Sequence, residues 1–367
     1  MAYKTEKNLR IRNVCLFFIA FLPTTKIFLL PSVLVRSAGS DMWISAAVNL
    51  LLDAVTLLCA VALWKRYEGK DYFEILTLNL GKTGARIVYG LYAIYFFLKA
   101  YTLVNEQKLY VERTLYENTT TVFTFLPFFL FSAYIASKKI FVLGRLADIL
   151  FLFTAVGLVM LYALAFSNTD FGAILPVGVN GAGKILQGTF ASLNWYGDAV
   201  YLYFLLGTIP PEKKAVAKLL PSYLIAGLFP VLCMLMFYGI FSSVAVRQEF
   251  AMTEIAKYSV AINNIGRFDY IAILALLFSG SVAMCLPIYF ATECFVRITG
   301  IRKKIYVSAA VSAAMLLLVL VLRERYASAM NFFIGWGSVF FVVMGNVVPL
   351  CTLFLRRKEK NEQESGG

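Results

Sequence analysis

The chain has 367 residues and a formal net charge of +13; 60% of its residues are hydrophobic and only 15% are charged. Soluble proteins carry roughly 25% charged residues, so this composition excludes a water-soluble fold and predicts an all-α polytopic membrane protein. The sequence contains no histidine, which excludes His-based catalytic triads, imidazole metal sites and histidine proton relays.

The six cysteines are scattered, mostly within apolar segments, and form no CxxC pair. This distribution is typical of thiols packed in a core and supports neither a disulfide framework nor a zinc site. We therefore expect no metal and no cofactor, apart from a coupling proton or monovalent cation. We also expect no nucleic-acid partner, because the basic residues lie mainly at the ends of apolar runs, where they face anionic lipid headgroups.

An apolar run of about 20 residues can cross the ~30 Å hydrocarbon core of a bilayer as a helix. The chain contains ten such runs, and residues 356–367 form a polar tail. We therefore expect a single transmembrane domain over residues 1–367. The predicted spans are 12–35, 42–64, 84–105, 121–137, 143–166, 187–209, 219–244, 269–296, 305–322 and 331–355.

The distribution of Lys and Arg provides an independent test of this span count, because cytoplasmic loops are enriched in basic residues. With ten spans and a cytoplasmic N-terminus, 23 of the 34 basic residues fall on the cytoplasmic side and 9 on the other. A wrong count would scramble the alternation between rich and poor loops. The pattern predicts that both termini are cytoplasmic.

A shift of about 175 residues superimposes the first five predicted spans on the last five. Short amphipathic stretches, at 71–80 and at 248–264, follow the second span of each half. Because each half has an odd number of spans, the second must run with inverted topology. We therefore predict two inverted repeats of five helices, over about 12–166 and 187–355.

The first span of each repeat is interrupted by polar residues near its middle. Freed backbone at this depth is tolerated only where it is buried or lines a cavity. The corresponding positions predict a ligand site at two helix breaks; the alternative is a proline kink in one helix and a glycine-mediated contact in the other. The candidate ligand-binding residues are Pro23, Thr24, Thr25 and Lys26 in the first break, and Asn194, Trp195, Tyr196, Gly197 and Asp198 in the second.

Three ionisable residues near mid-span, Lys26, Asp53 and Asp198, are candidates for ion coupling. Each costs roughly 2.5–3.5 kcal/mol at a helix centre on insertion scales, so each should face protein or water. We expect Lys26 and Asp198 to pair across the site; the alternative is an ion pair that only tethers two helices. Asp53 is either a proton or cation site or a polar group bonded to Asn49.

Two further charges are interpreted as structural. Lys99 lies about six residues from the outer end of its span and is expected to snorkel, with Glu106 nearby. Glu293 is expected to pair with Arg297, which follows it by four residues on a helix.

The residues expected to line the pocket come from the third and eighth spans. Tyr92 and Tyr95 share one helical face with Lys99 and are either pocket walls or interhelical packing. Ser279 is the candidate from the eighth span. Trp195 and Tyr196, at the second break, are the aromatic residues best placed to contact a ligand.

Four stretches of the chain resemble the GerAB-type spore germination permeases, which belong to the amino acid–polyamine–organocation superfamily. They are LLPSVLVRSAGSDMWIS (29–45), GKTGARIVYGLY (81–92), GRLADILF (144–151) and ILPVGVNGAGKILQG (174–188). The resemblance implies a LeuT-like fold, with a substrate held between unwound parts of helices 1 and 6 and walled by helices 3 and 8. It also implies a germinant receptor in the bacterial cell membrane or spore inner membrane, with a larger membrane subunit and a lipoprotein subunit as partners.

Two functions are compatible with these features. The first is a transporter-like receptor subunit that senses a small nutrient, such as an amino acid, during spore germination. The second is a proton- or cation-coupled amino acid transporter. We do not expect an enzyme, because the sequence has no metal-ligand cluster, and the GVNGAGK stretch (178–184) lacks the spacing and terminal Ser or Thr of a phosphate-binding loop.

Overall fold

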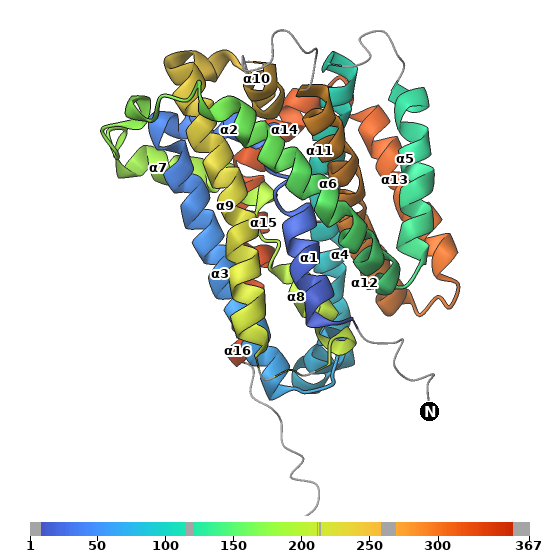
Figure 1. Ribbon diagram of the computed structural model, residues 1–367. Coiled ribbons are helices and arrows are strands. Elements are labelled where there is room, and N and C mark those ends of the chain that lie inside the picture. The colour runs from blue at the N-terminus through green and yellow to red at the C-terminus, as the bar shows by residue number, and fades with distance from the viewer. Residues whose placement is uncertain (1–8, 115–120, 211, 213, 258–268, 355–367) are drawn as a thin grey trace, which may run out of the picture.

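The computed structural model describes residues 9–114, 121–210, 212, 214–257 and 269–354. Within these residues the protein is helical and contains no strand (Figure 1). Seven helical stretches are long and apolar enough to cross a membrane, and two shorter apolar helices accompany them. The chain is therefore a multi-pass membrane protein. The predicted tail at 356–367 lies outside the described residues.

The first half of the chain is a series of helices that run between the two ends of the molecule (Figure 1). The expected first span is divided into two helices, and the long fourth helix contains a non-helical residue, Gly81, with φ 76° and ψ 169°. This glycine separates the predicted amphipathic stretch at 71–80 from the expected third span. The helices are α1 (Ile11–Phe21), α2 (Leu30–Ala38), α3 (Met42–Arg66), α4 (Tyr72–Thr114), α5 (Thr121–Ser137) and α6 (Ile140–Phe166).

The second half contains shorter helices because several expected spans are interrupted. The predicted amphipathic stretch at 248–264 begins with α10, and its last seven residues lie outside the described residues. The helices are α7 (Gly181–Ala191), η4 (Leu193–Trp195), α8 (Val200–Leu205), α9 (Ala215–Phe241), η6 (Ser242–Arg247), α10 (Ala251–Lys257), α11 (Asp269–Ala283), α12 (Cys285–Thr299), α13 (Lys304–Val321), α14 (Tyr326–Ile334), α15 (Gly337–Val342), η8 (Val343–Val347) and α16 (Val348–Phe354). Short 3-10 helices also occur at Gly39–Asp41, Phe171–Ile174 and Leu206–Thr208.

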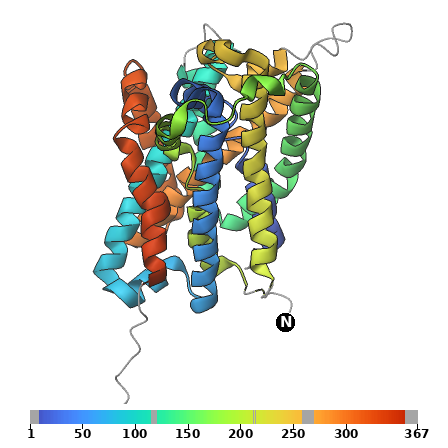
Figure 2. The ribbon, with the colours of Figure 1, turned by 90° about the vertical axis from the view of Figure 1, so that its left-hand side faces the viewer.

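The helices pack around α1 and α8, which lie side by side at the centre of the bundle in Figure 1. Helix α1 packs between α6 and α9, and α4 packs against α12. Figure 2 shows α3 between α9 and the C-terminal helices, and contacts with α9 and α16 agree with that view. Large apolar side chains remain exposed on the outside of the bundle, as expected for a surface that faces lipid.

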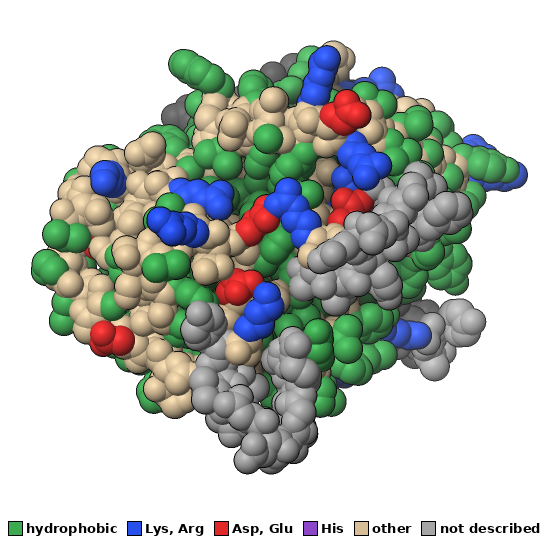
Figure 3. Space-filling model, turned by 90° about the horizontal axis from the view of Figure 1, so that it is seen from above, with side chains coloured by type: hydrophobic (Ala, Val, Ile, Leu, Met, Phe, Trp, Pro, Cys, Tyr) green, Lys and Arg blue, Asp and Glu red, His purple; other side chains and the backbone are tan. Residues whose placement is uncertain are grey.

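The end of the molecule at the top of Figure 1 carries the starts of α3 and α11 and the ends of α4, α6 and α9. Figure 3 shows this face, where basic and acidic side chains lie next to each other. Ion pairs there join Arg113 to Glu249 and Lys257 to Glu254. The first of these pairs joins the end of α4 to the segment that leads into α10, and the Thr253 hydroxyl of α10 lies 3.0 Å from the Tyr110 hydroxyl of α4.

Candidate functional site

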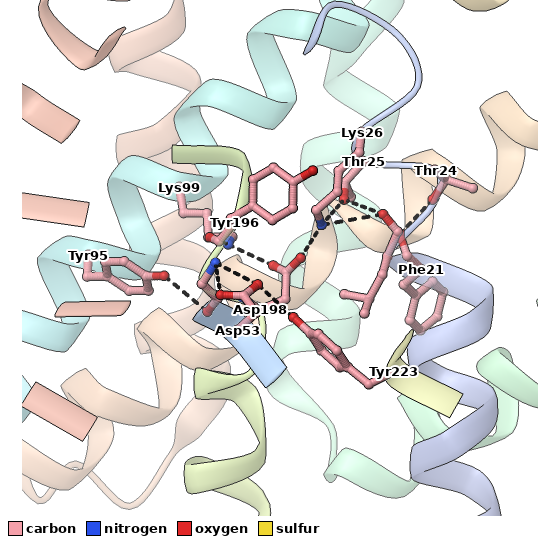
Figure 4. Close-up of polar contacts among 12 residues, drawn as sticks. Phe21, Thr24, Thr25, Lys26, Asp53, Tyr95, Lys99, Tyr196, Asp198 and Tyr223 are labelled. Atoms are coloured by element: carbon pink, nitrogen blue, oxygen red, sulfur yellow. Dashed lines mark hydrogen bonds and ion pairs between the residues drawn. The ribbon is translucent and has the colours of Figure 1, made fainter. Parts of the chain in front are cut away.

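The first non-helical segment follows α1 and covers residues 22–29. Pro23 stands directly after the helix, where a residue without a backbone N–H is common. The hydroxyls of Thr24 and Thr25 donate to the carbonyl oxygens of Phe21 and Leu22 at 2.9 and 3.0 Å. These bonds satisfy the last turn of α1 and leave the side chain of Lys26 free to turn into the protein (Figure 4).

The second non-helical segment is the break between α7 and α8, residues 192–199, and includes the single 3-10 turn of η4. Gly197 has φ +80°, and a Cβ at this position would lie 2.5 Å from the hydroxyl oxygen of Tyr95. Tyr95 instead donates a hydrogen bond of 3.2 Å to the Gly197 carbonyl oxygen. Only glycine fits this close approach, because it adopts positive φ readily and has no side chain.

Asp53 fixes the second segment from the middle of α3. Its carboxylate accepts hydrogen bonds of 2.9 and 3.0 Å from the Gly197 N–H, and one of 2.7 Å from the Tyr223 hydroxyl of α9. The expected partner of Asp53, Asn49, instead donates to the Thr189 carbonyl oxygen and to Ser192. The Asn49 alternative is wrong because the non-helical segment offers Asp53 unpaired backbone donors at the same depth.

Asp198 joins the two segments through its carboxylate, as Figure 4 shows. One oxygen pairs with Lys26 Nζ, and the other lies 2.7 Å from Lys99 Nζ. The predicted Lys26–Asp198 pair is confirmed. We refer to Lys26, Asp53, Lys99 and Asp198 as the charge cluster; all four side chains are buried, and their formal charges cancel.

The interpretation of Lys99 as a snorkelling residue is wrong. Helix α4 continues to Thr114, so Lys99 lies far from its end and is only 1% exposed. Its ammonium group also donates to the Tyr196 carbonyl oxygen. The helical face that Lys99 shares with Tyr92 and Tyr95 was the sequence signal for this position.

Glu106, which was expected only to lie near Lys99, is a second link between the segments. It is 2% exposed and accepts a hydrogen bond of 2.6 Å from the Leu29 N–H, where α2 begins. Its other oxygen accepts from Trp195 Nε1 at 2.9 Å. No local pattern predicts these bonds, because both partners of Glu106, Leu29 and Trp195, are far from it in the sequence. They meet only because α4 continues two turns beyond Lys99.

The remaining predicted site residues lie around the charge cluster in different roles. Asn194 and Tyr196 are buried, and neither the Asn194 amide nor the Tyr196 hydroxyl has a hydrogen-bond partner within the described part of the chain. Tyr92 packs among aromatic rings, including Tyr72 and Phe204, which fits the packing alternative. Ser279 bonds to Thr154 and to the Ala20 carbonyl oxygen, at the junction of α1, α6 and α11.

A layer of aromatic side chains covers the charge cluster on the side that faces the start of α1. Tyr201 stacks between Phe96 and Phe290, with ring centroids 5.6 and 5.1 Å away. Phe290 also lines a pocket of about 190 Å³ at that end. The charge cluster is therefore separated from this pocket by stacked rings.

The predicted Glu293–Arg297 pair is also wrong. Arg297 reaches Asp71, with an Nη2–Oδ2 distance of 2.6 Å, and Glu293 pairs with Lys304. Both bonds connect elements that the sequence spacing does not bring together. The Arg297–Asp71 pair lies in the lining of the 190 Å³ pocket and joins α12 to the residue before α4.

The geometry of the site does not show which family the chain belongs to, whereas the comparison with protein families does. The profile of a family described as spore germination protein matches residues 10–327. The chain belongs to the spore germination protein family. The family is one of membrane proteins of permease or receptor type that act in germination. The comparison with curated proteins found no match to the chain.

Proposed function

We propose that this spore germination protein is a transporter-like receptor subunit that binds a small nutrient at its two non-helical segments. The observation that carries the proposal is Asp198, which is shared by one lysine from the first segment and another from α4. The unpartnered polar groups of Asn194 and Tyr196 support it, because a buried amide or hydroxyl normally has a partner. An amino acid offers both a carboxylate and an ammonium group to such a site.

We further propose that the architecture is the LeuT-like arrangement of ten spans in two inverted repeats, as in the amino acid–polyamine–organocation superfamily. In this arrangement α1–α2 and α7–α8 form the interrupted first span of each repeat. The packing supports this proposal: α3 contacts α9 and α5 contacts α13, and these are pairs of helices that the repeat relates to each other. Likewise the contact of α1 with α9 has its counterpart in the contact of α7 with α3, and that of α2 with α9 in the contact of α8 with α3.

Nutrient binding would change which groups form ion pairs in the charge cluster. A nutrient carboxylate that reaches Lys26 competes with Asp198, and the first segment is then no longer tied to the second through this pair. A ligand can shift a conformational equilibrium only by its different affinity for the two states, and this exchange of partners supplies such a difference. In the spore inner membrane, the change would pass to a larger membrane subunit and a lipoprotein subunit.

The test is binding and uptake of radiolabelled amino acids by the purified chain in liposomes, alone and together with its partner subunits. We expect saturable binding without accumulation. Asp198→Asn should weaken it at least tenfold, because it removes the carboxylate that would receive the ammonium group of the amino acid, and Trp195→Ala should weaken it to a similar degree. Asp170→Asn is the matched control, because Asp170 caps the Gly172 N–H away from the cluster. Absence of binding in both preparations, or equal binding by Asp198→Asn and the unmodified chain, would overturn the proposal.

The second candidate function is a proton- or cation-coupled amino acid transporter. It is favoured by one observation, the presence of two buried carboxylates at the second segment: Asp198 lies within the segment, and Asp53 accepts from its backbone, including the Asp198 N–H. Buried carboxylates at this depth occur in many ion pathways. Accumulation of amino acid driven by a proton or sodium gradient in the same liposomes would select this function over the receptor.

A further inference from the structure

A second hollow lies on the outer surface of the bundle, away from the charge cluster. It is an open groove of about 470 Å³ between α4, α12 and α13. Ile94 is 50% exposed and Tyr306 is 64% exposed along it. Its lining contains no charged residue: Ala93, Ile94, Phe97, Phe295, Thr299, Ile301, Tyr306, Val307, Ala310, Val311 and Ala314. We call it the α4–α13 groove.

The groove begins near the loop between α12 and α13, at the lower right of Figure 1, and runs along α13 from Tyr306 to Ala314. Eight residues of helix correspond to about 12 Å at 1.5 Å per residue. That length is close to half of the ~30 Å hydrocarbon thickness, the depth of one leaflet. A transmembrane helix seated on α13 would be expected to follow it to Val321, beyond the end of the groove.

The open end of the groove is surrounded by basic side chains. Arg302 and Lys303 are exposed in the α12–α13 loop, and Lys303 Nζ lies 5.7 Å from the ring centroid of Tyr306. Arg86 is also exposed, about two turns before Ile94 toward the start of α4. Among the described residues, none of these three cations has an ion-pair partner, whereas the neighbouring Lys304 is paired with Glu293.

We propose that the α4–α13 groove binds one acyl chain of an anionic phospholipid, whose phosphate group lies against Arg302 and Lys303. Apolar lining, one-leaflet depth and unpaired positive charge at the mouth are three independent features that match this ligand. The positive-inside count assigns the mouth to the cytoplasmic side, where anionic lipid attracts basic residues beside membrane helices. This site is separate from the nutrient site, and its test does not depend on nutrient binding.

The test uses native mass spectrometry of the full chain in detergent, titrated with phosphatidylglycerol or with phosphatidylethanolamine of the same acyl chains. We expect the unmodified chain to retain phosphatidylglycerol more tightly. The double variant Arg302→Gln/Lys303→Gln should bind phosphatidylglycerol roughly 25-fold more weakly, since each basic residue contributes about fivefold in affinity for anionic lipid. Its affinity for phosphatidylethanolamine should stay unchanged.

The second variant, Ala310→Trp, fills the groove without changing its charge and should weaken the binding of both lipids. The matched control is Lys65→Gln/Lys70→Gln, which removes two charges near the end of α3, outside the groove. A control that loses as much phosphatidylglycerol as the Arg302/Lys303 variant would overturn the proposal. So would an Ala310→Trp chain that binds phosphatidylglycerol like the unmodified chain, or a groove found by cross-linking at Ile301 to be occupied by a partner helix.

Discussion

Asp53 and Asp198 are carboxylates with different tasks, although they contact the same backbone segment. Asp53 accepts only hydrogen bonds, from backbone N–H groups and from Tyr223, whereas Asp198 accepts from two ammonium groups. A carboxylate held by fixed donors stabilises a conformation of the backbone. One held by two flexible lysines can exchange a partner, because a second ammonium group remains when the first leaves. We therefore expect Asp53 to hold the shape of the proposed site and Asp198 to change partners when the nutrient binds.

Gly197 offers a direct test of how tightly that backbone is held. We expect Gly197→Ala to lower the unfolding free energy by more than the roughly 1–2 kcal/mol that positive φ costs a non-glycine residue, because its Cβ also meets the Tyr95 hydroxyl. The matched control is Gly69→Ala, at φ +76° with no atom within 4 Å of the added Cβ. Denaturation of both variants in detergent measures the difference.

The collision at Gly197 can be relieved from the other side. Adding Tyr95→Phe removes the oxygen that lies 2.5 Å from the added Cβ, and the ring carbon behind it is at 3.7 Å, an ordinary contact. The double variant Gly197→Ala/Tyr95→Phe should therefore be more stable than the sum of the two single changes predicts. Additive losses, or equal losses at Gly69 and Gly197, would show that the close approach of α4 is not a constraint.

At the scale of elements, α4 organises the site because three of its turns hold the two non-helical segments. Tyr95 bonds to Gly197, Lys99 to Tyr196 and Asp198, and Glu106 to Leu29 and Trp195. These contacts lie one after another along α4, from Tyr95 to Glu106. Movement of α4 against the segments would change all three together, which makes α4 the element that could report ligand binding to the rest of the bundle.

Glu106 tests this role of α4. We expect Glu106→Ala to increase hydrogen exchange in residues 22–29 and 192–199 together, because it leaves the Leu29 N–H and Trp195 Nε1 without an acceptor, at about 1–3 kcal/mol each. Trp195→Phe is the matched control, since it keeps the Leu29 bond and should affect only 192–199. Faster exchange in one segment alone after Glu106→Ala would mean that the link does not couple them.

The sequence predicted the helix breaks and the Lys26–Asp198 pair, but not the partners of Lys99 and Glu106. The breaks were predictable because Pro23 and the Asn194–Asp198 run interrupt apolar patterns locally, and the pairing of Lys26 with Asp198 followed from their matching positions. Lys99 and Glu106 could not be placed, because their partners depend on the length of α4 and on how it packs. The Arg297–Asp71 and Glu293–Lys304 pairs failed for the same reason: local spacing favours a neighbour on the same helix, and tertiary packing supplied closer partners.

At the scale of the whole molecule, the inverted repeat requires that equivalent connections lie on opposite sides of the membrane. The connection after α3 and the connection after α9 are equivalent in the two proposed repeats. We therefore expect Glu68→Cys to react with a membrane-impermeant maleimide only after cells are permeabilised, and Val246→Cys to react in intact cells. Ile301→Cys should behave like Glu68→Cys, and Val179→Cys like Val246→Cys, which gives one reference position for each side.

The reason for this expectation is the odd number of crossings in each repeat together with the surplus of Lys and Arg on one side. All four positions are exposed, and the unmodified chain, whose Cys351 is exposed, supplies the background of labelling. If Glu68→Cys and Val246→Cys reacted from the same side, the number of crossings between them would be even, and two inverted five-helix repeats would be excluded. If Glu68→Cys reacted in intact cells and Val246→Cys only after permeabilisation, the inverted repeat would stand but the orientation of the chain in the membrane would be reversed. The mouth of the α4–α13 groove would then lie in the outer leaflet.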